Sequence, residues 1–269
     1  MKTALVQMAS GPDKEENIRK ATGFACEAFL KGARFVCFPE YFYFRGPLKT
    51  AEEVERVCEP LNGPTVGGFA ALAKANKAYI LLGSIYEKAN GRGRAYNTSV
   101  LLDPKGEVRA VYRKKNLFHV RLPGAEVRES DIFNAGTTAT LTKVGPFTLG
   151  MAMCFDVRFP AMFEAYARKG ANLFTVPASF SHATGQAHWE ILVRARAVET
   201  FSYVLAPNQT GINAQGLPCW GQSMIVDPWG RILALATTDR EEIVYASLDI
   251  KEPRSRRRMF PGYKDLNGS

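Results

Sequence analysis

Short apolar runs alternate with amphipathic stretches along the first part of the chain. The expected elements are strands at residues 3–8, 34–38 and 79–86 and helices at residues 14–31 and 64–76. Apolar runs of this length, bounded by turn residues, are typical of buried strands. Gly32 follows the first helical stretch, where a glycine commonly ends a helix. Strands that alternate with helices in this way indicate an α/β fold.

The second half of the chain repeats this order of elements. Its expected strands are residues 147–153, 172–177 and 203–207, with helices at 160–167 and 186–200. Each half ends in a hairpin whose turn reads Asp-Pro-x-Gly, at residues 103–106 and 227–230. The repeat predicts a four-layer αββα sandwich, in which two mixed sheets stack, helices cover the outer faces and the halves form an internal pseudo-repeat.

The C-terminal residues differ from the rest of the chain in composition. Residues 242–249 read as one more strand, and the dense basic run at 254–258 follows. We divide the chain into a main domain at residues 1–250 and a basic tail at 251–269, which we expect to form a short helix and an extended arm.

Charge and apolar length restrict the partners. The chain has 269 residues and a net charge of +9, but most basic residues are scattered and no aromatic-basic stripe accompanies them. We therefore expect no nucleic-acid partner. No apolar run approaches the ~18 residues that a membrane span needs, so we expect no membrane partner.

Cysteine usage indicates the compartment. The five cysteines are Cys26, Cys37, Cys58, Cys154 and Cys219. The number is odd, the spacings are irregular and no CxxC pair occurs, which favours reduced thiols over disulfides or a zinc site. With no signal peptide at the start of the sequence, we expect a cytoplasmic protein.

Three residues that could do chemistry stand at the ends of apolar strands: Glu40, Lys114 and Cys154. Cys154 lies where a strand turns into a helix, where backbone N–H groups and the helix dipole favour a thiolate and bind an oxyanion. A buried carboxylate serves as a base, and a lysine stabilises negative charge on an attacked carbonyl. The set fits acyl transfer from an amide.

Each of the three also has an ordinary structural interpretation. Cys154 could be a small buried apolar residue, and Glu40 could cap a helix or lie in an exposed loop. Lys114 could belong to a solvated basic cluster at residues 113–115. Periodicity and spacing alone do not bring the three together.

Three spaced motifs resemble those of the nitrilase superfamily of carbon–nitrogen hydrolases. They are Phe38-Pro39-Glu40, the segment from Tyr112 to Phe118 around Lys114, and the segment from Met153 to Pro160 around Cys154. The likeness is strongest to the Nit amidase branch, through segments at residues 177–180, 184–185, 188–190 and 194–199. It implies a carbon–nitrogen hydrolase domain at residues 1–250 with the αββα fold.

The resemblance implies a role for each motif residue. Cys154 is the nucleophile, Glu40 the general base, and Lys114 with the backbone N–H of Phe155 stabilises the oxyanion. A second catalytic glutamate is expected between the lysine and cysteine motifs. Glu129 is the better match, and Glu126 competes if the loop is shorter. No metal or organic cofactor is needed.

The branch acts on small anionic ω-amides, such as those of keto acids and deaminated glutathione. The residues expected to bind substrate are Phe155, Arg158, Tyr41, Ser179, Phe180 and His188. Arg158 could instead pair with Asp156 or Glu164, and Trp189, beside His188, is expected to pack in the core. Family members commonly form homodimers or larger homo-oligomers.

Two residues after the lysine depart from the branch. Asn116 stands where a histidine is usual, and His119 stands where an aspartate is common. The tail shows Tyr263 to Leu266 in place of the usual Arg-Pro-Asp-Leu-Tyr ending. These departures leave specificity open: a nitrilase, an N-carbamoyl hydrolase and a catalytically silent scaffold are the alternatives. A cysteine phosphatase is disfavoured because Arg158 lies too close to Cys154 for a phosphate-binding loop.

Overall fold

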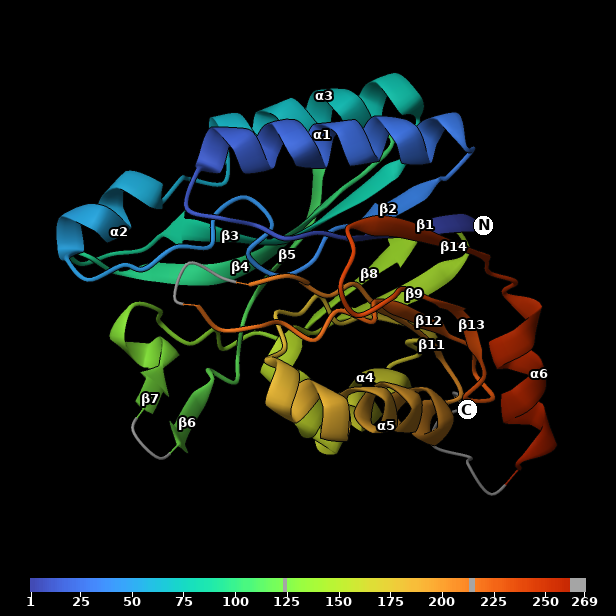
Figure 1. Cartoon of the computed structure of the whole chain (residues 1–269). Helices are drawn as coiled ribbons and strands as arrows, with labels where there is room; N and C mark the ends of the chain where they lie inside the picture. The colour runs from blue at the N-terminus through green and yellow to red at the C-terminus, as the bar shows by residue number, and fades with distance from the viewer. Residues whose placement is uncertain (123–124, 213–215, 262–269) are drawn as a thin grey trace.

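The computed structural model describes residues 1–122, 125–212 and 216–261, and its strands form two six-stranded mixed sheets that stack face to face (Figure 1). The first sheet has the order β14-β1-β2-β3-β4-β5 and the second β13-β12-β11-β10-β9-β8, while β6 and β7 form a separate hairpin. The strands are β1 Lys2–Gln7, β2 Phe35–Cys37, β3 Tyr79–Lys88, β4 Ala95–Leu102, β5 Val108–Arg113, β6 His119–Leu122, β7 Ala125–Arg128, β8 Thr140–Val144, β9 Phe147–Met151, β10 Leu173–Thr175, β11 Tyr203–Ala206, β12 Met224–Val226, β13 Ile232–Leu235 and β14 Glu242–Ser247.

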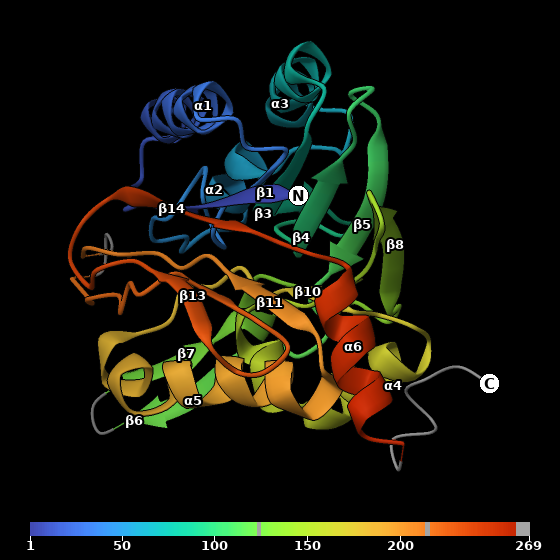
Figure 2. The ribbon, with the colours of Figure 1, turned by 90° about the vertical axis from the view of Figure 1, so that its right-hand side faces the viewer.

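Helices cover the two outer faces of the stacked sheets. The α-helices are α1 Lys14–Leu30, α2 Ala51–Val57, α3 Pro64–Asn76, α4 Pro160–Arg168, α5 His182–Thr200 and α6 Lys251–Met259, and the 3-10 helices are η1 Glu129–Asp131 and η2 Cys154–Arg158. Figures 1 and 2 show α1 and α3 above the first sheet and α4 and α5 below the second. The expected four-layer αββα sandwich is therefore confirmed.

The apolar core divides into two clusters that follow these layers. One cluster joins the facing sides of the two sheets and continues through the second sheet to α4 and α5, and Leu81, Phe174 and Trp189 belong to it. The other fills the space between the first sheet and its helices, and includes Val36, Phe69 and Ile80. Val36 and Cys37 point to opposite faces, as neighbours on a strand must, so both faces of β2 are buried.

The internal repeat appears in the sheets as two matching strand orders. β1 to β5 lie in sequence across the first sheet, and β9 to β13 lie in sequence across the second. After the β6–β7 hairpin, β8 joins the second sheet and pairs antiparallel with β9, and β14, which follows β13, joins the first sheet and pairs antiparallel with β1. Each half therefore completes the sheet of the other half.

Local signals explain the helix boundaries that the sequence predicts. The Asp13 side chain accepts a hydrogen bond from the backbone N–H of Glu16 and begins α1, and Gly32 ends it with a φ of 81°. Pro64 stands in the first turn of α3, where its missing N–H is not needed. Both helices match the expected ranges to within one residue.

Several short elements were not expected from the sequence. They are α2, the β6–β7 hairpin and β8, and α5 begins four residues before the expected start at residue 186. Residues 262–269, which include the tail motif and the expected arm, lie outside the described residues. In the described part of the chain, none of the helices is both long and apolar enough to span a bilayer.

Candidate active site

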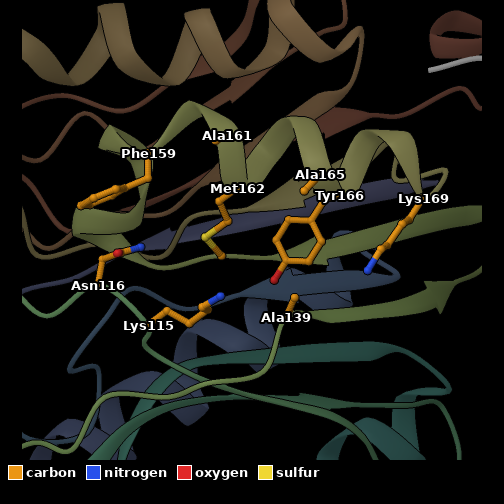
Figure 3. A pocket seen from close by; sticks show the side chains of 9 residues that line it. All are labelled: Lys115, Asn116, Ala139, Phe159, Ala161, Met162, Ala165, Tyr166 and Lys169. Atoms are coloured by element: carbon orange, nitrogen blue, oxygen red, sulfur yellow. The ribbon is translucent and has the colours of Figure 1, made fainter. Parts of the chain in front are cut away.

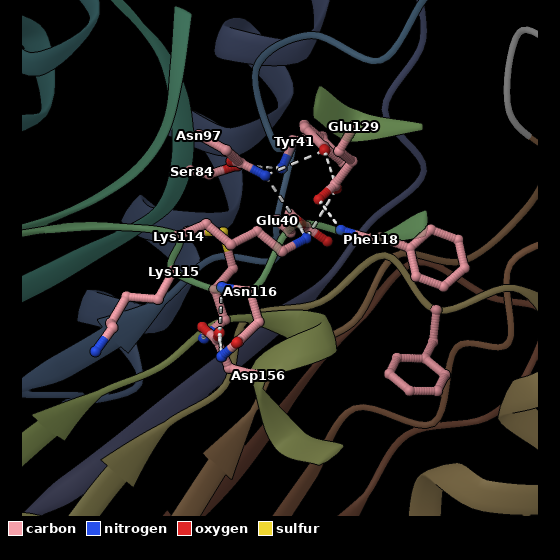
Figure 4. A network of polar contacts seen from close by, with 12 residues as sticks. Glu40, Tyr41, Ser84, Asn97, Lys114, Lys115, Asn116, Phe118, Glu129 and Asp156 are labelled. Atoms are coloured by element: carbon pink, nitrogen blue, oxygen red, sulfur yellow. Dashed lines mark hydrogen bonds and ion pairs between the residues drawn. The ribbon is translucent and has the colours of Figure 1, made fainter. Parts of the chain in front are cut away.

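Lys114 lies buried between two carboxylates (Figure 4). Its Nζ is 2.8 Å from Oε1 of Glu40 and 2.8 Å from Oε1 of Glu129. Lys114 directly follows β5, Glu40 follows β2 by three residues, and Glu129 begins η1 directly after β7. Three segments that are far apart in sequence thus place one cation between two anions.

Neutral donors hold the two carboxylates in place. Asn97 Nδ2 donates to Glu40 Oε1 at 2.9 Å, and the Tyr41 hydroxyl donates to Glu129 Oε1 at 2.7 Å. The backbone N–H of Phe118 donates to Glu129 Oε2 at 2.7 Å. Sequence reasoning missed Asn97, although a polar residue inside the apolar strand β4 was an available signal.

Cys154 begins η2, where β9 gives way to α4 through a short 3-10 turn. It is buried, its φ is 45°, and its backbone N–H donates to Pro177 O at 2.9 Å. Burial raises the pKa of the Cys154 thiol, the Glu40 carboxylate raises it further, and Lys114 only partly offsets this. Burial and the Glu40 charge therefore act against the thiolate that this position was expected to favour.

Burial and neighbouring charges also shift the pKa values of Glu40 and Lys114. Burial raises the pKa of Glu40, whereas the Lys114 charge and hydrogen bonds from Lys114 and Cys154 lower it. Burial lowers the pKa of Lys114, but Glu129 and Glu40 outweigh burial, so the pKa is raised overall and Lys114 remains an ammonium. A carboxylate base with a raised pKa, next to a thiol whose pKa is also raised, is suited to general-base activation of that thiol.

The choice between Glu129 and Glu126 follows from their positions. Glu126 is exposed on β7 and bonds with Arg121, His119 and Arg128. These hydrogen bonds, led by the one from Arg121, lower the pKa of Glu126 to about 2. Only Glu129 of the two contacts Lys114 in the described structure, and His119 lies on the hairpin with Glu126.

The sequence of residues 2–258 matches the family model described as "Carbon-nitrogen hydrolase". The chain belongs to the carbon–nitrogen hydrolase family. The Cys154, Glu40 and Lys114 motifs all lie inside the matched residues.

Relatives with this family's chemistry match nearly the whole chain. The mouse (Mus musculus) protein "Deaminated glutathione amidase" is 35% identical over 277 residues, covering 99% of this chain and 84% of its own. "Omega-amidase NIT2" of Bos taurus is 34% identical over 259 residues, covering 96% and 92%. The crystal structure of the C. elegans NitFhit protein aligns with a TM-score of 0.90 at 32% identity. That alignment covers 98% of this chain but only 64% of the worm protein.

Two arginines of this carbon–nitrogen hydrolase lie near the cysteine without an acidic partner among the described residues. Arg158 Nη2 lies 3.2 Å from His188 Nδ1, and its guanidinium lies 5.4 Å from the centre of the Phe180 ring. The alternative acid partners are engaged elsewhere: Asp156 binds neutral donors, and Glu164 pairs with Arg168. Neither ion pair considered for Arg158 forms.

The second arginine, Arg45, was not singled out from the sequence. Its Nη1 donates to the Sγ of the buried Cys219, and Cys219 pairs with Ser181 through an isolated β-bridge. Ser179 hydrogen bonds lower the pKa of both Cys219 and Cys154, although burial raises both overall. Arg45 is thus connected to the nucleophile through Cys219 and Ser179.

The remaining expected substrate residues have mixed surroundings. Phe155 is half-buried and packs edge-on against Phe118 and Phe159. Tyr41 is held by its bond to Glu129. Trp189 is fully buried, as expected, and its Nε1 donates to Gln222 O.

A separate pocket of about 390 Å³ opens beside α4, away from the Lys114 ammonium. Its lining includes Asn116, Met162 and Tyr166, and Figure 3 shows Met162 and Tyr166 pointing from α4 toward it. Glu40, Lys114 and Cys154 do not line this pocket, although Lys115, Asn116 and Phe159 of the lysine and cysteine motifs do. Within the described ranges, no cluster of three His, Cys, Asp or Glu residues could hold a metal ion.

Proposed function

We propose that this carbon–nitrogen hydrolase is a thiol-dependent amidase, which hydrolyses a small anionic ω-amide to a carboxylate and ammonia. The arrangement of Lys114 between Glu40 and Glu129, next to the Cys154 thiol, carries this proposal. It supplies a nucleophile, a base and a cation for the oxyanion within one buried site.

The reaction begins when Glu40 takes the proton of the Cys154 thiol and the sulfur attacks the amide carbon. The Lys114 ammonium and the backbone N–H of Phe155 stabilise the oxyanion. The tetrahedral intermediate then collapses: the C–N bond breaks, nitrogen takes the proton from Glu40, ammonia leaves and a thioester remains. Glu40 next accepts a proton from water, the resulting hydroxide attacks the thioester, and the acid leaves as the thiol is restored.

The anionic substrate class is supported by Arg158 and Arg45. A guanidinium without an acidic partner can bind a carboxylate through two parallel hydrogen bonds. Each of the two arginines can bind one acidic group of a substrate whose amide reaches Cys154. The Arg158 side chain lies against His188 and Phe180, and two relatives carry names that refer to ω-amides and to deaminated glutathione.

The test is ammonia or amine release from α-ketoglutaramate, deaminated glutathione, neutral aliphatic amides and nitriles, with Cys154→Ala as the paired control. We expect turnover of an anionic amide and none in the variant. Preferred turnover of a nitrile or an N-carbamoyl acid would replace the amidase with one of those activities. No turnover of any compound by the native protein would favour the silent scaffold.

Assembly and location belong to the same proposal. We infer a cytoplasmic homodimer or larger homo-oligomer from the family resemblance, and the free state of all five cysteines suits a reducing compartment. Light scattering on the purified protein measures the mass of the assembly directly, and a monomer at micromolar concentration would contradict this part.

A further inference from the structure

The Asp156 side chain is fully buried and accepts four hydrogen bonds. The Tyr112 hydroxyl donates to Oδ2 at 2.6 Å, and the backbone N–H of Met153 donates to the same oxygen at 2.9 Å. Asn116 donates to Oδ1 twice, from its backbone N–H at 3.1 Å and from Nδ2 at 2.8 Å. Figure 4 shows Asn116 and Asp156 side by side, next to the Lys114 segment.

These donors come from the two segments that carry the catalytic groups. Tyr112 and Asn116 stand two residues before and two residues after Lys114. Met153 precedes Cys154, and Asp156 itself follows Cys154 by two residues. One carboxylate therefore joins the lysine segment of the first half to the cysteine corner of the second half.

The cysteine corner needs such a restraint because its backbone is strained. Cys154 is a non-glycine residue with a φ of 45°, in the left-handed region. A residue in that region keeps its conformation only where the surroundings fix it. Asp156 holds the Ala152–Met153 peptide through Met153 N, and Pro177 O holds the next peptide through the N–H of Cys154 itself.

We propose that Asp156, with Tyr112 and Asn116, is a positioning device that holds the Cys154 sulfur in line with Glu40 and Lys114. The proposal rests on the proposed function, and it assigns Asn116 a purpose in this chain. A misplacement of about 1 Å can cost about 100-fold in rate, so a restraint between the two segments acts directly on catalysis. Burial raises the pKa of Asp156, but bonds from Tyr112 and Asn116 act against burial because they stabilise its carboxylate.

The first test compares Asp156→Asn and Tyr112→Phe with the control Tyr203→Phe. Tyr203 is also a buried tyrosine, but its hydroxyl bonds the backbone of Asp249, away from the two segments. We expect kcat to fall by about 100-fold in Asp156→Asn and about tenfold in Tyr112→Phe, with KM within about threefold of native. Tyr203→Phe should keep native kcat even if its Tm falls as far as that of Tyr112→Phe.

The second test exchanges the donor at position 116. Asn116→His keeps an N–H donor that can face Asp156, whereas Asn116→Leu removes the side-chain donor. We expect Asn116→His to retain most of kcat and Asn116→Leu to lose about tenfold. The two variants Asn116→Leu and Tyr112→Phe each lack one hydrogen bond to Asp156. A kcat equal to the native value in both variants would overturn the positioning role.

A readout without substrate separates this proposal from the proposed function. The rate at which iodoacetamide alkylates Cys154, followed by mass spectrometry of the Cys154 peptide, should fall in Asp156→Asn and Tyr112→Phe but not in Tyr203→Phe. Suppose that no amide is hydrolysed, yet alkylation is slower in Asp156→Asn and Tyr112→Phe and unchanged in Tyr203→Phe. The proposed function then fails and the positioning role stands. Unchanged alkylation in Tyr112→Phe and Asn116→Leu contradicts the positioning role whatever the substrate.

Discussion

At the scale of single residues, the site places a buried lysine between two carboxylates, beside a cysteine whose thiol pKa is raised by burial. Lys114 is fully buried and stays charged because two carboxylates lie 2.8 Å from its Nζ. Removing one partner of a buried charge leaves the other uncompensated, and this usually costs more than the net worth of the pair. Each member of the Glu40–Lys114–Glu129 group therefore depends on the others.

Substitution of Glu129 should distinguish it from Glu126. Glu129→Gln removes one of the two negative charges beside Lys114 and weakens the hydrogen bond from the Phe118 N–H. We therefore expect kcat to fall by about 100-fold or more. Glu126→Gln changes an exposed residue of the neighbouring hairpin and should leave kcat within about twofold of native. Steady-state kinetics of both variants measure the two changes in kcat. A loss of kcat in Glu126→Gln as large as that in Glu129→Gln would contradict the assignment of Glu129.

The pH dependence follows from the raised pKa of Glu40. The base acts only when ionised, so kcat/KM should fall as the pH drops through a value above the usual glutamate range. The charge of Glu129 contributes to raising this pKa, and Glu129→Gln should move the acid limb of the residual activity to lower pH. A profile of kcat/KM from pH 4 to pH 9 in both proteins measures the shift. An acid limb that moves upward would refute the assignment of Glu40 as the base.

The sequence predicted the three motif residues, but not how the site is held. Glu40, Lys114 and Cys154 stand at the ends of recognisable strands, and their pairing came from family resemblance. Asn97 was missed because a strand pattern does not show which polar residue faces a distant glutamate. The upward shift of the Cys154 pKa was missed because burial and the Glu40 charge depend on the tertiary fold.

At the scale of elements, Gly83 in β3 lets the end of the β2 segment approach closely. A Cβ at Gly83 would lie 2.1 Å from Pro39 O and 2.2 Å from Phe38 O. Backbone atoms cannot yield at that distance without moving the peptide that leads into Glu40. The glycine thus permits the position of the base.

Gly83→Ala should therefore reduce both activity and stability. We expect the free energy of unfolding to fall by about 1–3 kcal/mol, as in other overpacked cores, and kcat to fall at least tenfold. Gly67→Ala in α3 is the matched control, because a Cβ there meets no atom within 4 Å. It should raise stability by about 0.5–1 kcal/mol and leave kcat unchanged. Urea unfolding and kinetics of the two variants compare the effects.

Long elements with clear periodicity were the ones that the sequence predicted best. α1 and α3 match because a cap, a proline or a glycine marks their ends. The shorter α2 was missed, although Thr50 and Glu53 form a complete capping box at its start. Seven residues provide too few turns for a periodic pattern, and the β6–β7 hairpin is mostly exposed, so no apolar run marks it.

At the scale of the whole molecule, the buried Arg257 side chain joins α6 to the second half. Nη2 of Arg257 donates to Thr200 O at 2.9 Å and to Ser202 Oγ at 3.0 Å, and it also bonds Ala171 O. Burial lowers the pKa of Arg257 to about 10. The basic run of the predicted tail therefore contains a residue that joins α6 to the end of α5 and to the residues just before β10 and β11.

Arg257→Met should remove these bonds and leave buried acceptors without donors. We expect the free energy of unfolding to fall by about 1–3 kcal/mol. Arg258→Met is the control, because Arg258 is exposed, and its stability should stay within about 0.5 kcal/mol of native. Thermal and urea unfolding measure both variants, and equal stability would show that α6 is held by other contacts.

The strand exchange between the halves has a consequence for synthesis of the chain. β1 is synthesised well before its antiparallel partner β14, which spans Glu242–Ser247. Until β14 emerges, one edge of β1 has no partner, and an open strand edge invites pairing with other chains. The nascent first half must therefore wait, with an unfinished sheet, until β14 has been made, and during that time this edge is a place where a chaperone could protect the chain.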